Sequence, residues 1–180
     1  MTDFFLKIQE IIKADFFCPL VNGKLILQDK DSKGKKLGKP VNVEAKTDIV
    51  CLELDKKNEN IFQFFEPTVS DLCKIADRVL FYSKSDILYV FIVELKSGTT
   101  GDAFKQIKAS YVLSEFVVNT ARRMLNFKEV NVQYRGLIFS DKAYKFKTNP
   151  KDNFQQVEST SLKYQCLQSG QTIILDNFVH

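Results

Sequence analysis

The chain has 180 residues, of which 44% are hydrophobic and 27% charged, the composition of a folded domain large enough to bury a core. One histidine, at the C-terminus, and four cysteines without a Cys-x-x-Cys pair argue against a zinc site and against Cys–His or Ser–His catalysis. The formal charge of +4 permits a polyanionic partner without requiring one.

The scattered cysteines are typical of reduced, buried thiols in a cytosolic protein. Asp3 and Glu10 interrupt the apolar character of the N-terminus, so no signal peptide is expected. No apolar run approaches the length that spans a membrane. The sequence therefore predicts a cytoplasmic location without a membrane partner.

The first predicted element is an amphipathic helix over residues 3–17, in which Phe4, Ile8 and Ile12 recur at helical spacing. Two predicted strands follow, over residues 24–28 and 49–54. Between them lies a lysine-rich loop, residues 29–40.

Residues 24–46 contain seven lysines against three acids, an excess equal to the net charge of the chain. Lys33, Lys35 and Lys36 lie at its centre. One interpretation is a solubilising hairpin tip, and the other is an arm that contacts phosphates. The sequence alone leaves both open.

A short helix over residues 68–76 is predicted to lead into a β-hairpin, with strands from Asp77 to Tyr82 and from Ile87 to Lys96. A turn centred between residues 84 and 85 would place Asp77 opposite Ile92, within about two residues of Glu94. Side chains alternate along a strand, so Glu94 and Lys96 share one face. Two carboxylates and an ammonium thus converge at one end of an apolar hairpin, where oxygen ligands can hold Mg²⁺.

A long helix over residues 102–125 follows, and Gln106 in its first turns is expected near the strand end that carries Lys96. A strand over residues 130–139 completes a strand–helix–strand unit, which implies a right-handed crossover and a partly parallel sheet. A surface loop over 141–152 and a final hairpin over 163–175 complete the predicted order.

The hairpin and its helix resemble the core of the PD-(D/E)xK nuclease superfamily, the restriction-endonuclease-like fold. That pattern has an acid at the start of one strand, (D/E)-x-K on the next, and then a helix. Asp77, Glu94 and Lys96 match it, and Gln106 matches a glutamine that many members place on the helix. The resemblance covers about residues 71–141.

The length predicts one domain over residues 1–180. The resemblance implies that this domain is α/β, with a central mixed β-sheet flanked by helices. It implies hydrolysis of nucleic-acid phosphodiesters with Mg²⁺ or Mn²⁺ held by Asp77, Glu94 and the main-chain carbonyl of Leu95. Glu10 is a candidate further ligand. Lys96 would position the attacking water, and Gln106 would orient Lys96 or that water. The expected nucleic-acid contacts are Lys33, Lys35, Lys36, Lys105 and Lys108.

Three functions remain open at this stage. The first is an active nuclease, with DNA as the favoured substrate and a role in restriction or defence. The second is a non-catalytic binding or assembly subunit of the same fold. The third is a soluble protein-interaction domain in which Glu94 and Lys96 form only an ion pair. A homodimer, or a partner protein that supplies targeting, fits either nuclease-fold alternative.

Overall fold

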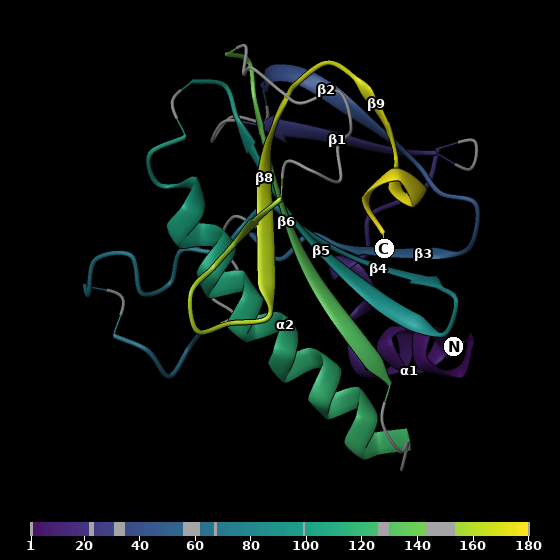
Figure 1. Ribbon diagram of the computed structural model, residues 1–180. Helices are drawn as coiled ribbons and strands as arrows, with labels where there is room; N and C mark the ends of the chain where they lie inside the picture. Colours follow the sequence, from purple (N-terminus) through teal and green to yellow (C-terminus); the bar gives the residue numbers. More distant parts are fainter. Residues whose placement is uncertain are drawn as a thin grey trace.

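The computed structural model describes residues 2–21, 24–30, 35–55, 62–66, 68–98, 100–125, 130–142 and 154–179. They form an α/β structure of two mixed β-sheets and two α-helices (Figure 1). The helices are α1 (Thr2–Ile11) and α2 (Ala103–Leu125), with short 3-10 turns at Ala14–Phe16 and Leu175–Phe178. The strands are β1 (Leu25–Lys30), β2 (Lys36–Glu44), β3 (Ile49–Leu52), β4 (Arg78–Lys84), β5 (Ile87–Lys96), β6 (Asn131–Ser140), β7 (Gln155–Gln156), β8 (Leu162–Gln168) and β9 (Thr172–Ile174).

The larger sheet has six strands in the order β3-β4-β5-β6-β8-β7. β5, β6 and β8 run parallel, whereas β3, β4 and β7 pair antiparallel with their neighbours. The smaller sheet has the order β1-β2-β9, and β2 pairs parallel with β9. The parallel pairing of β5 with β6 confirms the crossover that the sequence predicts.

The six-stranded sheet lies between two apolar layers, with the helices on one face and the smaller sheet on the other (Figure 1). Alternate residues of β5 divide between them: Leu88, Val90 and Ile92 pack with α1 and α2, and Tyr89, Phe91 and Val93 pack under β1 and β2. A strand buried on both faces is expected to read as a continuous apolar run, as β5 does. Glu94 and Lys96 continue the helix-facing series.

The β4–β5 hairpin turns at Ser85 and Asp86, both with positive φ (50° and 60°), which is typical of a two-residue type I′ turn. Arg78 pairs with Val93, and Lys84 pairs with Ile87. The predicted register, with Asp77 opposite Ile92, was therefore wrong by two residues, because the turn centre lies one residue further along the chain. The correct turn centre lies between Ser85 and Asp86, where the left-handed backbone of the turn matches the strand twist. Of the two residues, only aspartate adopts this backbone readily.

α2 approaches the sheet closely above Gly136 of β6. A Cβ at this position would lie 2.8 Å from Ile107 Cγ2 and 2.9 Å from Tyr164 Cβ, so glycine leaves the room into which the helix packs. Ile107 is fully buried, and its neighbour Gln106 is half-buried. The close approach brings the first turns of α2 to the end of β5.

The predicted helix over residues 68–76 is absent from the described residues, which form successive turns there. Leu72 N–H donates to Val69 O, and Lys74 N–H donates to Asp71 O, over three residues each. Asp71 has φ 65°, which interrupts a right-handed helix. Its carboxylate forms ion pairs with Lys74 and Lys105.

Three further predictions need correction. The N-terminal helix ends at Ile11, and the chain then extends so that Phe17 bridges to Leu52. The described residues of the predicted lysine-rich loop are largely strand, because β1 runs to Lys30 and β2 begins at Lys36. The C-terminal strands do not form a hairpin: β8 adds to the large sheet beside β6, and β9 adds to the small sheet beside β2. The predicted loop over 141–152 lies mostly outside the described residues.

Candidate active site

Two carboxylates meet at the open end of the β4–β5 hairpin. Continuing the register beyond Arg78–Val93 places Asp77 opposite Glu94. The Asp77 N–H donates to Glu94 Oε2 at 3.2 Å, and the Leu95 N–H donates to Asp77 Oδ2 at 2.7 Å. The hydrogen bonds therefore hold each carboxylate against the main chain of the other strand. Glu94 is almost fully buried, while Asp77 is half-buried.

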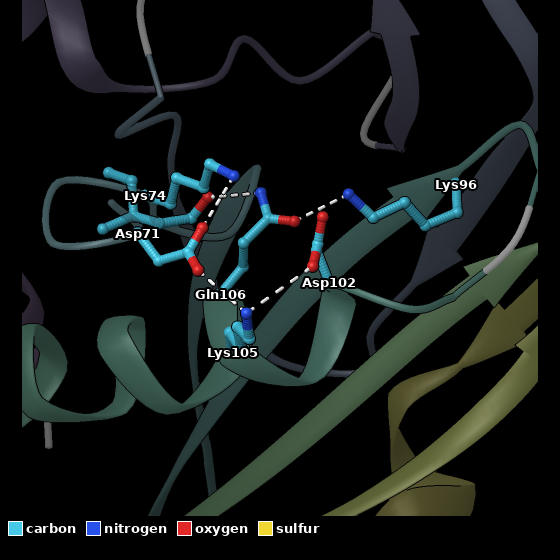
Figure 2. Close-up of polar contacts among 7 residues, drawn as sticks. Asp71, Lys74, Lys96, Asp102, Lys105 and Gln106 are labelled. Atoms are coloured by element: carbon cyan, nitrogen blue, oxygen red, sulfur yellow. Dashed lines mark hydrogen bonds and ion pairs between the residues drawn. The ribbon is translucent and has the colours of Figure 1, made fainter. Parts of the chain in front are cut away.

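Lys96 lies on the same face, two residues beyond Glu94. Its ammonium is 2.5 Å from Glu94 Oε1 and donates to Gln106 Oε1 at 2.6 Å. The Gln106 amide in turn donates to the main-chain carbonyl of Ile75 at 3.0 Å. Figure 2 shows Gln106 reaching from α2 between Lys96 and the segment that precedes Asp77. The structure thus brings Asp77, Glu94, Lys96 and Gln106 into one hydrogen-bonded cluster.

Burial governs the electrostatics of the two acids. It raises the pKa of Glu94 above its ordinary value, and the charge of Asp77 raises it further, against the lowering effect of Lys96. Burial also raises the pKa of Asp77, against the hydrogen bond from Leu95 and the charge of Arg78. Such raised carboxyl pKa values occur where negative charge is held without sufficient compensation. A cation between the two groups would supply that compensation.

The donor chemistry fits a hard divalent cation. Carboxylates and main-chain carbonyls are the oxygen ligands that Mg²⁺ accepts, usually with several waters retained. Among the described residues, no three histidine, cysteine or acidic side chains group closely enough to hold a metal ion. The protein would therefore contribute two carboxylates, Asp77 and Glu94. The Leu95 carbonyl remains a predicted ligand.

The other predicted site residues lie apart from this cluster. Glu10 is exposed on α1 and pairs with Lys7, and no described contact joins it to the carboxylates. Lys35 and Lys36 are exposed at the start of β2, and Lys33 lies outside the described residues. Lys105 Nζ binds Asp71 Oδ2 at 2.8 Å, and Lys108 lies 5.5 Å from the centre of the Phe104 ring.

Sequence reasoning missed residues that hold the cluster in place. The Ser110 hydroxyl accepts the Ala76 N–H at 2.7 Å, one turn of α2 beyond Gln106. Arg78 donates to the main-chain carbonyl of Asp77 at 2.7 Å and forms an ion pair with Glu53. The i, i+4 spacing of residues 106 and 110 on a helix that faces Lys96 could have indicated Ser110. No local signal indicated Arg78.

Comparison with protein-family models, with curated proteins and with solved structures finds no match. Within the described part of the chain, no helix is both long and apolar enough to cross a bilayer.

Proposed function

We propose that this protein is a metal-dependent nuclease that hydrolyses nucleic-acid phosphodiester bonds in the cytoplasm, with a restriction-endonuclease-like core. One observation carries the proposal: Asp77, Glu94, Lys96 and Gln106 form a single cluster at the end of β5. They do so on the helix-facing side of a mixed sheet, which supports the resemblance. The pairing of buried acids with raised pKa values and one lysine favours a functional site over a surface ion pair.

A bound Mg²⁺ or Mn²⁺ would polarise the scissile phosphate and neutralise charge on its oxygens. Asp77 and Glu94 would bind that cation from two adjacent strands. The Lys96 ammonium would hold the attacking water by a hydrogen bond and offset negative charge as it develops. Gln106 would fix the direction of that ammonium, because its amide is itself anchored on Ile75.

Strands β1 and β2, with their lysines, form a pair that we call the β1–β2 ribbon. It lies near the end of β5 that carries Lys96, which supports capture of a polyanion. Lys39 N–H donates to Asp141 Oδ1 at 3.4 Å, and Asp141 N–H donates to Lys96 O at the same distance. Asp141 therefore links Lys39 of β2 to Lys96 at the end of β5. Lysines on this ribbon could contact phosphates on either side of the bond that is cut.

A non-catalytic assembly subunit of the same fold is the second candidate. The observation that favours it is an exposed apolar pair on α2, Val112 and Phe116, which are 63% and 68% exposed. Exposed apolar side chains one helical turn apart suit contact with a partner protein. This candidate predicts nucleic-acid binding or protein association without cleavage.

The test is cleavage of a panel of single- and double-stranded DNA and RNA by purified protein with Mg²⁺ or Mn²⁺. The proposal expects cleavage of at least one substrate, and its loss in chelator. Glu158→Gln, an exposed acid far along the chain from the cluster, serves as a control beside Asp77→Asn. Cleavage that persists in chelator, or that survives Asp77→Asn, contradicts the proposal.

A further inference from the structure

The segment that precedes Asp77 is held on α2 by three contacts in succession. At its start, Asp71 Oδ2 pairs with Lys105 Nζ at 2.8 Å. At its end, the Ile75 carbonyl accepts from Gln106 at 3.0 Å, and the Ala76 N–H donates to Ser110 at 2.7 Å. Figure 2 shows the first part of this arrangement, with Lys105 and Gln106 both reaching the 71–75 segment. The chain from 71 to 76 follows the helix from 105 to 110 in the same direction.

The contact at Ser110 is the one that cannot be replaced by water. Ser110 and Ala76 are both fully buried. Ala76 precedes β4, so no strand partner satisfies its N–H. A buried N–H without an acceptor is costly, so the main chain at Ala76 would move if the hydroxyl were removed. The next residue is Asp77, whose N–H and carboxylate both bind the opposite strand.

We propose that Ser110 is a positioning residue that fixes the main chain before Asp77 and so sets the separation of the Asp77 and Glu94 carboxylates. This role rests on the proposed function for its kinetic consequence, but its structural consequence is independent of it. We call the three contacts of Lys105, Gln106 and Ser110 with the 71–76 segment the clamp. The Asp71–Lys105 ion pair is its exposed outer part. Removal of a group that orients metal ligands weakens the affinity for the metal. We expect a smaller effect on the binding of the nucleic acid.

The main experiment compares Ser110→Ala with Ser114→Ala. Ser114 is also buried on the same side of α2, but its hydroxyl donates to the Ser110 carbonyl at 2.6 Å and forms no hydrogen bond with the described 71–77 segment. In Ser110→Ala we expect the apparent Mn²⁺ affinity to fall about tenfold, with kcat at saturating Mn²⁺ and KM for nucleic acid within about threefold of wild type. Ser114→Ala should retain the wild-type Mn²⁺ affinity. Where wild type shows Mn²⁺-dependent cleavage, equal Mn²⁺ affinity in the two folded variants overturns the proposal.

A second readout separates this proposal from the proposed function. Amide hydrogen exchange at Ala76 and Asp77 should be faster in Ser110→Ala than in Ser114→Ala, while exchange along β5 stays the same. Wild-type protein that cleaves nothing refutes the nuclease proposal, but faster exchange at these two amides still supports positioning by Ser110. Equal protection of the two amides in both variants refutes positioning, whether or not the protein cleaves nucleic acid.

A pair of exposed substitutions covers the case in which Ser110→Ala does not fold. Lys105→Gln removes the ion pair between Asp71 and α2, whereas Lys74→Gln removes an ion pair of Asp71 within its own turn, at 2.7 Å. The two lysines are exposed to a similar degree, 59% and 54%. Lys105→Gln should accelerate exchange at Ala76 and Asp77 more than Lys74→Gln does. Equal exchange in the two variants contradicts the clamp.

Discussion

The N–H of Leu95 donates to Asp77 Oδ2 at 2.7 Å, so the acid that immediately precedes β4 is held by the residue that lies between Glu94 and Lys96. Leu95 itself faces the opposite side of the sheet and packs under the smaller sheet. Leu95 therefore has two roles. Its side chain packs in the core, and its main-chain N–H orients the carboxylate of Asp77, a candidate metal ligand. The position of Asp77 depends on the hairpin register as much as on its own side chain.

Glu94→Gln should stabilise the protein in the presence of chelator. Burial and the charge of Asp77 raise the pKa of Glu94, so the ionised carboxylate is less favourable in the folded state than in the unfolded state. An amide of the same shape removes that penalty, and Lys96 keeps its bond to Gln106. We expect a gain of about 1 kcal/mol in the free energy of unfolding, measured by urea titration at neutral pH. A loss of similar size would show that the Glu94–Lys96 ion pair outweighs the burial.

Asp176→Asn should have the opposite effect on stability. Burial raises the pKa of Asp176, but hydrogen bonds from Lys84 and Tyr82 outweigh it and leave the pKa below its ordinary value. The Tyr82 hydroxyl lies 2.8 Å from Asp176 Oδ2, and Lys84 Nζ lies 2.9 Å from Oδ1. The contribution of Asp176 is therefore present above its unfolded pKa of about 4 and is lost as the pH falls through its folded pKa.

Thermal unfolding of wild type and Asp176→Asn between pH 2 and 7 measures this effect, with about 4 as the turning point. The variant should be less stable near neutral pH, and the difference should shrink toward the acid end. A difference that is constant across the range would assign the loss to packing instead of to charge.

Gly136→Ala should destabilise the protein by about 1–3 kcal/mol, because the added methyl would meet Ile107 and Tyr164 at 2.8 and 2.9 Å. The same contact positions the start of α2, so cleavage should fall together with stability. Gly98→Ala is the matched control, because nothing lies within 4 Å of a Cβ at that position. Equal unfolding midpoints for the two variants would show that α2 moves away at little cost.

The combined change of Lys33, Lys35 and Lys36 to glutamine should weaken nucleic-acid binding on all sequences alike. Each lysine that contacts a phosphate releases condensed counterions, so the salt dependence of the affinity should become shallower. Cleavage of bound substrate should be little changed, because Lys35 and Lys36 lie at the start of β2 and not on β5. Affinities measured at several salt concentrations test this, and identical slopes would leave the ribbon without a role in binding.

The sequence predicted the candidate cluster well because its residues carry local signals. The apolar run of β5 and the alternation of its side chains place Glu94 and Lys96 on one face. Asp77, just before the other strand of the hairpin, lies opposite Glu94. The register was missed because the turn at Ser85 and Asp86 contains no glycine to mark it. The positive φ values of these two residues are seen only in the folded chain. The correct register brings Asp77 closer to Glu94 than the predicted one.

The remaining fold depended on distant contacts that the sequence does not encode locally. β2 begins with exposed residues and contains Pro40, so it resembles a loop until Val41 and Val43 enter the core. β8 and β9 are adjacent in the chain but belong to different sheets. Ser110 was not predicted because a buried serine on a helix becomes significant only once Ala76 lies against it.

Cleavage assays of wild type, Asp77→Asn and Lys96→Ala, with Mg²⁺ and with chelator, test the central claim most directly. In the proposed mechanism both residues act on charge that develops in the transition state, so each substitution should lower the cleavage rate by about a hundredfold or more. The far-UV circular dichroism of both variants should match wild type, which shows that the fold is intact. Metal-dependent cleavage by wild type that both substitutions abolish is the predicted result. Cleavage at the wild-type rate in either folded variant would contradict the assignment of this cluster as the active site.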